Sequence, residues 1–303
     1  MYTDGCTIPQ KEGFSVNTLK TWLLMGILTA IIVLLGSTFG GTSGATLALV
    51  IALGINGASY FYSDKIALAV SGAKPVSEVN SPQLYTIVRH LSTRAGLPMP
   101  RVYMAPAQEP NAFATGRNPQ TAVIVVNRGL LDVLTERELT GVLAHEMSHI
   151  RHRDILIASI AAALAGAITW IAELLRWGMF FGFGGGNDNR NQNVAADLAF
   201  IILAPIAALL IQLAISRSRE YKADAGAAHL MRDPDALADA LAKLGHTSRF
   251  GTRARGQRQQ PAAAAAMAHM YIVNPLSGAQ LGGLFSTHPP MDERIRRLRL
   301  MRI

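Results

Sequence analysis

Apolar residues gather in four long windows along the chain, at about 20–38, 45–62, 155–175 and 195–215. A transmembrane helix needs roughly 20 residues, at ~1.5 Å of rise per residue, to cross the hydrocarbon core of a bilayer. Each window approaches that length, so the pattern predicts about four membrane-spanning helices. The glycine-rich loop 36–44 predicts a hairpin between the first two windows, and the Gly- and Asn-rich segment 178–193 joins the last two in the same way.

The first window is interpreted as a retained anchor and not as a cleaved signal peptide. About 20 mostly polar residues precede it, and no clear cleavage site of small residues follows it. The third window carries Glu173, and the fourth carries Asp197 and Pro205. Ionisable residues are costly within a bilayer, so an alternative for these two windows is a pair of partly shielded helices inside a protein bundle.

The polar segment between the hairpins predicts a helix over 82–96 and short strands at 101–104 and 121–127. Pro82 occupies the first position of the helix, where its missing N–H is not needed. The second strand contains a largely β-branched run. Thr135 and Glu138 have the spacing of a capping box, which predicts that another helix begins there.

The region after the fourth window predicts a helix through 220–230, a helix that begins at Asp233-Pro234, and a basic loop at 249–260. The loop is either a contact with anionic lipid headgroups or a solvated loop without a partner. The patterns divide the chain into an N-terminal extension, a transmembrane hairpin, a polar segment, a second hairpin and a second polar segment, at 1–17, 18–62, 63–154, 155–215 and 216–303.

Positive charge is distributed unevenly. The chain carries 28 Lys and Arg against 20 Asp and Glu, a formal net charge of +8. The polar segments 63–153 and 216–303 hold 24 of these basic residues, which places both segments on the cytoplasmic side of a membrane by the positive-inside rule. Topology and anionic lipid headgroups therefore explain the charge, and nucleic acid is not an expected partner. The single cysteine, Cys6, excludes an intramolecular disulfide and a cysteine-rich metal site.

The segment His145-Glu146-Met147-Ser148-His149 has the spacing of a metal site. On a helix, His145 and His149 lie on one face with Cβ atoms about 5–6 Å apart, so both imidazoles can bind one Zn²⁺. Glu146 projects about 100° round the helix and can reach a water molecule at the fourth position of the metal. Such a carboxylate acts as general base in peptide hydrolysis and can return the proton to the leaving amine.

A catalytic zinc usually takes three protein ligands, so one more is needed. His152 lies on the same helical stripe, but a regular helix carries it a turn too far along for a compact site. Glu220 is the better candidate, and Asp224, one turn later, can accept a hydrogen bond from a ligand imidazole. The alternative for this pair is a solvated acidic face that balances the nearby arginines. His149 lies six residues before the third window and Glu220 five residues after the fourth, so a hairpin brings both to one depth on the same side of the membrane.

Four ordered motifs extend this picture, at 111–116, 145–154, 218–224 and 286–295. Together they resemble the HtpX family of bacterial heat-shock membrane proteases, which are related to the CAAX prenyl proteases. The resemblance covers about residues 17–303. It implies a predominantly α fold with a small β-sheet, in which a zincin-like metalloprotease domain of the gluzincin type is attached to an integral membrane bundle of about four transmembrane helices. It also implies one Zn²⁺ per chain, with His145, His149 and Glu220 as ligands and Glu146 as catalytic base.

The resemblance further suggests residues that contact the substrate. The strand 121–127 is similar to the edge strand of zincins, which pairs with an extended peptide. The substrate-binding residues on this interpretation are Asn111, Ala112, Ala122, Val123, Ile124, Val125 and Val126. His288 and Arg294 match the last motif, where a cationic or donor group could stabilise the developing oxyanion or fix the Glu220 region. The alternatives are a structural turn for His288 and a structural salt bridge for Arg294.

The function implied by the resemblance is that of a multi-pass zinc endopeptidase of the bacterial inner membrane, with its active site in the cytoplasm. Its expected role is protein quality control in the stress response, with the membrane and unfolded protein or peptide substrates as partners. A CAAX-type prenyl protease is one alternative, although four spans are too few for the large chamber that it needs. A non-enzymatic membrane scaffold that only holds the metal is the other.

Overall fold

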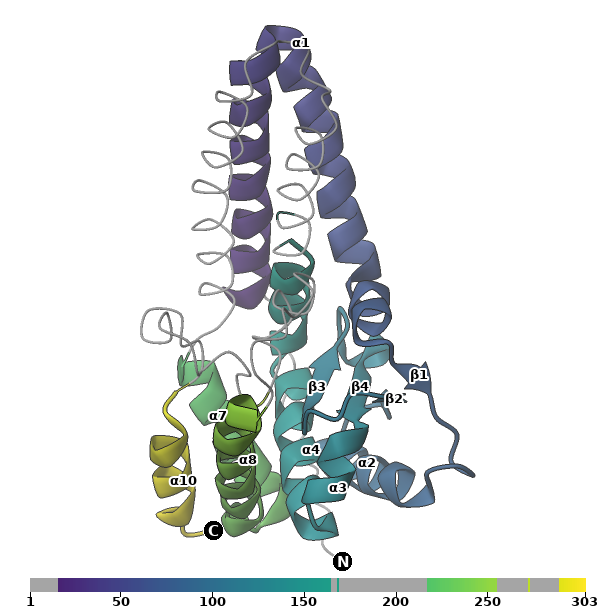
Figure 1. Cartoon of the computed structure of the whole chain (residues 1–303), viewed down its shortest axis with the longest axis vertical. Coiled ribbons are helices and arrows are strands. Elements are labelled where there is room, and N and C mark those ends of the chain that lie inside the picture. Colours follow the sequence, from purple (N-terminus) through teal and green to yellow (C-terminus); the bar gives the residue numbers. More distant parts are fainter. Residues whose placement is uncertain (1–15, 165–167, 169–216, 255–271, 273–288) are drawn as a thin grey trace, which may run out of the picture.

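A computed structural model of the chain describes residues 16–164, 168, 217–254, 272 and 289–303. They form a long helical hairpin that projects from a part in which helices surround one small sheet (Figure 1). In chain order the elements are α1 (Val16–Ser71), β1 (Lys74–Pro75), α2 (Pro82–Ala95), β2 (Arg101–Ala105), β3 (Ala112–Thr115), η1 (Pro119–Thr121), β4 (Val123–Asn127), α3 (Arg128–Val133), α4 (Glu136–Arg151), α7 (Arg217–Met231), α8 (Pro234–Ala254) and α10 (Met291–Arg299).

The long element α1 folds back on itself near Gly41, whose backbone φ of +57° lies in the left-handed region that favours glycine. The two legs of the hairpin are joined by a hydrogen bond in which Asn56 Nδ2 donates to Thr29 Oγ1 at 2.7 Å. A polar pair between two apolar helices satisfies groups that would otherwise be exposed to hydrocarbon. The structure thus agrees with the hairpin expected around 36–44.

The second leg of the hairpin, Gly41–Ser71, is long and apolar enough to cross a bilayer, with a mean hydropathy of 1.5. The first leg contains a shorter apolar stretch, Leu19–Leu34. Large apolar side chains are exposed along both legs, among them Leu23, Leu47, Val50, Leu53 and Phe61. An apolar surface of this extent marks a contact with a membrane or with another protein, and the length of the second leg fits a membrane.

Several segment predictions are only partly covered. Within the described ranges, only the second leg of α1 passes the length and composition test for a span, so four crossing helices remain a prediction. Of the third apolar window the structure describes the helix Asp154–Leu164 and Ile168, whereas the fourth window, 195–215, lies outside the described residues. The hairpin helix continues past the predicted boundary at residue 62 to Ser71. The predicted basic loop begins later than residue 249, because α8 continues to Ala254.

Four strands form one mixed sheet in the order β1-β2-β4-β3. Strands β2 and β4 run parallel, with Val102 opposite Ile124. Strand β3 is antiparallel to β4, with Ala114 opposite Ile124, and β1 is antiparallel to β2. Within the part of the chain that the structure describes, β3 is an edge strand of the sheet. It packs against α4, the helix that carries the His-Glu-x-x-His segment.

The prediction that 121–127 is an edge strand is wrong. Strand β4 lies between β2 and β3 and is buried along its whole length. A strand that is paired on both sides and covered on both faces has an unbroken apolar sequence, and the β-branched run has this composition. The residues Ala122, Val123, Ile124, Val125 and Val126 are each at most 2% exposed, so they offer a substrate neither side chains nor a free backbone edge.

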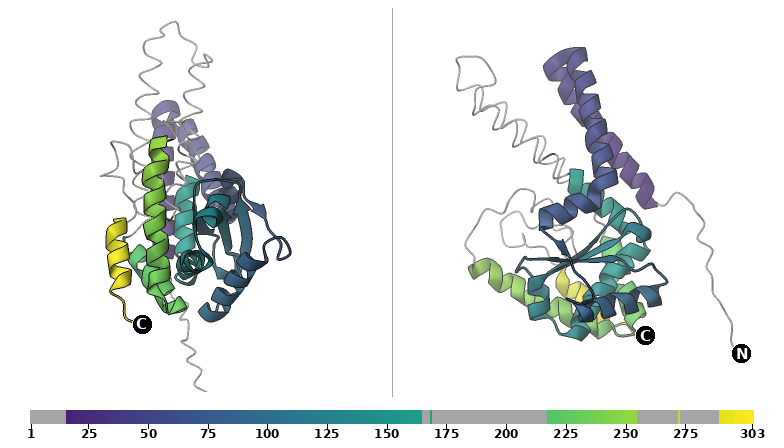
Figure 2. Two further views of the ribbon diagram at one scale, coloured as in Figure 1. Left: turned by 60° about the horizontal axis from the view of Figure 1, so that its bottom comes forward. Right: turned by 90° about the vertical axis from the view of Figure 1, so that its right-hand side faces the viewer.

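The motif helix α4 is central to the domain. It packs against α7, α8, α2 and β3. In the left view of Figure 2, α8 and α10 lie on one side of α4 and the sheet lies on the other. Gly141 permits the close approach of α8, because a Cβ at this position would lie 2.8 Å from the backbone nitrogen of Leu237. The polar residues of the motif are therefore held inside the protein and not on a solvated face.

Local signals at the helix ends are confirmed. Thr135 Oγ1 accepts from the Glu138 N–H, and the Thr135 N–H donates to Glu138 Oε2 at 2.8 Å, which completes the capping box of α4. Lys243 Nζ of α8 also donates to Glu138 Oε2, at 2.7 Å, so the cap ties the two helices together. Helix α2 begins at Pro82 as predicted and ends before Gly96, which has a φ of +66°.

Candidate metal centre

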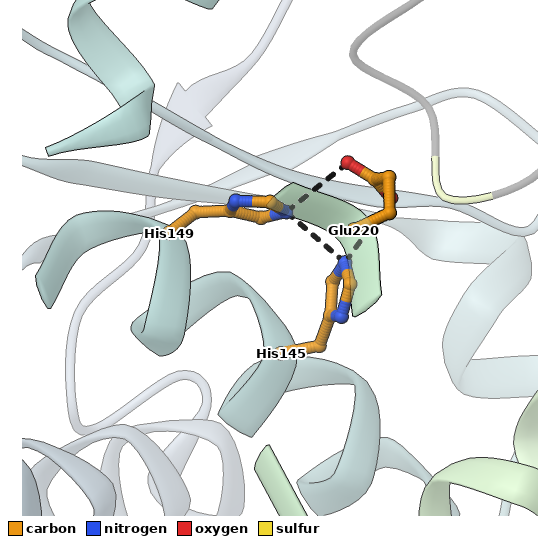
Figure 3. A group of neighbouring side chains, drawn as sticks. All are labelled: His145, His149 and Glu220. Carbon is orange, nitrogen blue, oxygen red and sulfur yellow. Dashed lines mark hydrogen bonds and ion pairs between the residues drawn. The ribbon is translucent and has the colours of Figure 1, made fainter. Parts of the chain in front are cut away.

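Three side chains from α4 and α7 converge in the core (Figure 3). His145 Nε2 and His149 Nε2 lie 3.1 Å apart. The carboxylate of Glu220 lies 3.8 Å from His145 Nε2 and 3.6 Å from His149 Nε2. The structure thus unites the two histidines of the motif with the acid that the sequence suggested as the third ligand.

The three groups fit a tetrahedral zinc ion. Ligand atoms at about 2.0–2.1 Å from a tetrahedral zinc are about 3.3 Å apart. The two Nε2 atoms, 3.1 Å apart, are close to that spacing, and the two oxygens of Glu220 lie slightly beyond it, Oε1 at 3.6 Å from His149 Nε2 and Oε2 at 3.8 Å from His145 Nε2. His152 lies outside this group, because its Nδ1 is directed at the Ser148 carbonyl oxygen, 2.8 Å away.

The second nitrogen of each imidazole meets a carboxylate. His149 Nδ1 and Asp154 Oδ2 form a hydrogen bond of 3.2 Å. His145 Nδ1 lies 3.0 Å from Asp224 Oδ1, although the carboxylate is off the direction in which a ring N–H would donate. Carboxylates in such positions fix the orientation of the rings and raise the basicity of the nitrogens that face the metal. Asp224 therefore lies beside His145 as predicted, but the predicted hydrogen bond with the imidazole is not formed.

The role of Asp154 is not predicted from the sequence. The sequence does hold a hint, because a carboxylate at the start of an apolar window needs a partner. In the structure Asp154 is only 7% exposed. What the sequence does not show is the turn at Arg153, which has a φ of +58° without being a glycine. This turn separates α4 from the helix that begins at Asp154, and the carboxylate lies beside His149.

Arg294 of α10 is completely buried behind the metal ligands. Its Nε and Nη2 donate to the two oxygens of Asp224 at 2.9 and 2.7 Å. Its Nη1 also lies 3.9 Å from Glu220 Oε2. These contacts agree with the structural salt bridge that was the alternative to an oxyanion role for Arg294. They orient the carboxylates of Asp224 and Glu220. His288, the other residue considered for this role, lies outside the described residues.

Burial and neighbouring charges move the pKa values of the two histidines in opposite directions. Burial lowers the pKa of His145, and Asp224 opposes this only in part. Burial acts in the same sense on His149, but Asp154 and Glu220 outweigh it and raise the pKa of His149 to about 9. One imidazole is therefore neutral at pH 7 while the other holds a proton, which a metal ion has to displace.

Glu146 lies next to the ligands and faces the edge strand. Its Oε2 accepts a hydrogen bond of 2.9 Å from the Ala114 N–H of β3. Burial, together with the nearby charge of Glu220, raises the pKa of Glu146 to about 7, although His149 opposes the shift. A carboxyl group with a pKa near neutrality is suited to accept and return a proton.

Asn111 and Ala112, both predicted to bind substrate, lie at the start of β3. Asn111 Oδ1 accepts from the Ile272 N–H at 2.9 Å, and its Nδ2 has no hydrogen-bond partner among the described residues, although Asn111 is only 1% exposed. Arg294 Nη1 donates to the Ile272 carbonyl oxygen at 3.4 Å, which links the same segment to the metal ligands. Asn111 is therefore linked to the site through Ile272 and Arg294, although Asn111 and Ala112 are as buried as the five residues of the β4 region.

Gly226 allows α7 to approach α4 closely. A Cβ at this position would lie 2.2 Å from Ser148 Oγ and 3.1 Å from Ser148 Cβ. The spacing between the two helices sets how far Glu220 stands from the histidines. The distance of Glu220 from the two histidines therefore depends on the absence of a side chain at Gly226.

A buried His-Glu-x-x-His helix with a carboxylate from a second helix beside the two histidines is typical of the site of a metallopeptidase. Comparison with known proteins gives the same class, since residues 78–302 match the model of peptidase family M48. A protease HtpX homolog of Pelotomaculum thermopropionicum is 50% identical over 289 residues, which cover 95% of this chain and 100% of the relative. A protease HtpX homolog of Desulfatibacillum aliphaticivorans is 51% identical over 283 residues, which cover 93% of this chain and 89% of the relative.

A crystal structure of Ste24p from S. mikatae aligns with a TM-score of 0.47 and 18% sequence identity, covering 93% of this chain and 64% of that one. The family match and the curated relatives establish that the chain belongs to peptidase family M48 and, within it, to the HtpX proteases. It is a membrane-associated metallopeptidase.

Proposed function

We propose that the chain is a zinc-dependent endopeptidase that cleaves misfolded or damaged membrane proteins at the cytoplasmic face of the bacterial inner membrane. The observation that carries the proposal is the convergence of His145, His149 and Glu220 beside Glu146. The set of two histidines and one glutamate, with a fourth position left for water or substrate, is that of catalytic zinc sites.

The proposed chemistry divides between the metal and one carboxylate. Zinc would act as a Lewis acid on the scissile carbonyl group and on a water molecule. Glu146, which lies on the same helix as the two histidines and beside Glu220, takes the proton of the attacking water as general base. The protonated carboxyl group then donates to the nitrogen of the leaving amine. Before a substrate pairs with β3, the hydrogen bond from the Ala114 N–H orients this carboxylate.

The proposed substrate site is the outer edge of β3, which pairs with no strand in the described part of the chain. The Asn111 carbonyl accepts from the Asn127 N–H, so the backbone N–H and C=O groups of the odd-numbered residues of β3 are directed toward β4. The alternating pattern of an antiparallel ladder directs the backbone groups of Ala112 and Ala114 the other way, and the bond from the Ala114 N–H to Glu146 has this direction. An extended peptide that pairs with this edge would lie beside the metal. Backbone pairing tolerates many sequences, which suits unfolded substrates.

The proposed location follows from charge and chain connectivity. Helix α4 ends at Arg151, and the apolar helix Asp154–Leu164 begins three residues later, so the site is close to the membrane. The basic residues of 63–153 and 216–303 support a cytoplasmic position and a contact with anionic lipid headgroups. Unfolded segments of membrane proteins could enter from this side.

Glu146→Gln tests the proposal. The variant should lose at least about 100-fold of its casein cleavage, the usual contribution of a general base, while its zinc content stays at one per chain. Glu136→Gln is the matched control, because it removes an exposed glutamate from the first turn of the same helix and should leave cleavage unchanged. Cleavage by Glu146→Gln at the wild-type rate would show that the proposed mechanism is wrong.

The wild-type protein distinguishes the alternatives in the same assay. Cleavage of a farnesylated peptide in place of unfolded casein would favour a CAAX-type prenyl protease. Zinc binding without turnover of either substrate would favour a membrane scaffold.

A further inference from the structure

A basic groove of about 530 Å³ lies on the outer side of the helices that carry the metal ligands. Six of the residues that line it are basic or can become so, namely Arg94, Arg151, His152, Lys222, His229 and Arg232. None of the lining residues is acidic. The groove is separate from the metal site, because the ligands are on the buried faces of α4 and α7, whereas Arg151 and Lys222 are exposed.

The charges of this groove are not neutralised within the described part of the chain. Arginines outside the groove form salt bridges, as in the contacts of Arg89 with Glu78 at 2.6 Å and of Arg137 with Asp233 at 2.7 Å. No carboxylate among the described residues forms a salt bridge with the four permanently charged residues of the groove, which are Arg94, Arg151, Lys222 and Arg232. Four cations in one concave space repel each other unless an anion joins them.

Helix ends explain only part of this arrangement. Arg94 is in the last turn of α2, Arg151 is the last residue of α4, and Arg232 directly follows α7. A cation at the C-terminal end of a helix is favoured by the helix dipole. That effect acts on each helix separately. It explains neither why three helix ends meet at one groove nor why Lys222, from the middle of α7, is added to them without an acid.

We propose that this groove binds an anion that carries two or more phosphate groups. A guanidinium donates two parallel hydrogen bonds to phosphate, and the three arginines here lie at the C-terminal ends of three different helices. A single phosphate group carries about −1.5 to −2 charges at pH 7, which leaves the four fixed positive charges only partly compensated. The anion reaches the groove either as a free polyphosphate or as the headgroup of a lipid with two phosphates.

Binding of tripolyphosphate to the full chain in phosphatidylcholine nanodiscs tests the proposal by isothermal titration calorimetry. Arg94→Gln/Arg232→Gln should weaken the affinity at least about tenfold, because two charge-assisted contacts are lost. Arg128→Gln/Arg302→Gln is the matched control, since it removes two exposed arginines outside the groove and gives the same net charge. The control should bind within about twofold of wild type. Zinc content verifies that both variants are folded.

Nanodiscs that contain cardiolipin distinguish the two sources of phosphate. If cardiolipin blocks tripolyphosphate binding by the wild type, the lipid headgroup occupies the groove, and if it has no effect, the ligand is a free polyphosphate. Either result supports the proposal when accompanied by the tenfold loss. Absence of saturable binding by the wild type in phosphatidylcholine, unchanged affinity of Arg94→Gln/Arg232→Gln, or equal losses in both variants would overturn it.

Discussion

Asp154 Oδ2 lies 3.2 Å from Nδ1 of His149, and this hydrogen bond joins an apolar helix to the metal centre. Asp154 is the first residue of that helix, whereas His149 belongs to the last turn of α4. The orientation of one proposed ligand is therefore set from outside its own helix.

Asp154→Ala should lower the affinity for zinc about 10- to 100-fold, because an imidazole that loses its carboxylate partner is less basic and less well oriented. Competition with a chromophoric chelator measures this affinity. Asp132→Ala, which removes an exposed aspartate from α3, is the control and should bind zinc like the wild type. Equal zinc affinities for the Asp154 variant and the wild type would contradict the assigned role.

Arg294→Met should lower the free energy of unfolding by about 3–5 kcal/mol, because it leaves the carboxylate of Asp224 buried without its partner. Chemical unfolding followed by circular dichroism measures the change. The double variant Asp224→Asn/Arg294→Met removes both charges and should recover part of the loss. A double variant that is no more stable than Arg294→Met would show that the cost does not come from an uncompensated charge.

The same ion pair predicts a dependence of stability on pH. Burial by itself would raise the pKa of Asp224, but Arg294 outweighs it and lowers the pKa to about 2. Because the folded-state pKa is below the unfolded value of about 3.9, the stabilisation is complete above that value and is lost as the pH falls toward 2. The stability difference between the wild type and Asp224→Asn should therefore shrink by about 2 kcal/mol between pH 5 and pH 2. A difference that is constant over this interval would contradict the prediction.

Gly226→Ala should reduce zinc binding and proteolysis together, because its Cβ would meet Ser148 Oγ at 2.2 Å and push α7 away from α4. Ser148→Gly removes both atoms that the new methyl group would meet, so Ser148→Gly/Gly226→Ala should regain zinc. Gly245→Ala is the control, since its Cβ would make only an ordinary contact at 3.6 Å with Met291. Zinc stoichiometry of the four proteins gives the comparison, and a failure of the double variant to regain zinc would argue against the steric explanation.

Features that depend on neighbours along a helix could be predicted from the sequence. The capping box needs only Thr135 and Glu138 at the right spacing, and two histidines four residues apart face one point on any regular helix. Glu220 could be suggested because two apolar windows lie between it and His149, so that a hairpin returns the chain to the same side. In each case the geometry follows from a local rule or from counting.

Features that depend on pairing across the fold could not be predicted in this way. The β-branched run of β4 is equally compatible with an edge or a central strand, and only its contacts with β2 and β3 decide between them. The contact of Asp154 with His149 depends on the backbone turn at Arg153. The burial of Arg294 depends on how α10 docks against α7, which no periodicity in its own sequence shows.

The dispersal of the site over α4, α7 and α10 has a consequence for biosynthesis. A ribosome that has translated α4 has made the two histidines and the general base, but the third carboxylate follows only with α7 and the arginine that holds it only with α10. The growing chain therefore lacks a complete hydrolytic centre until translation has passed α10. On the proposed ligand set, a partly synthesised copy without α7 would lack one of the three metal ligands and could not hydrolyse peptide bonds.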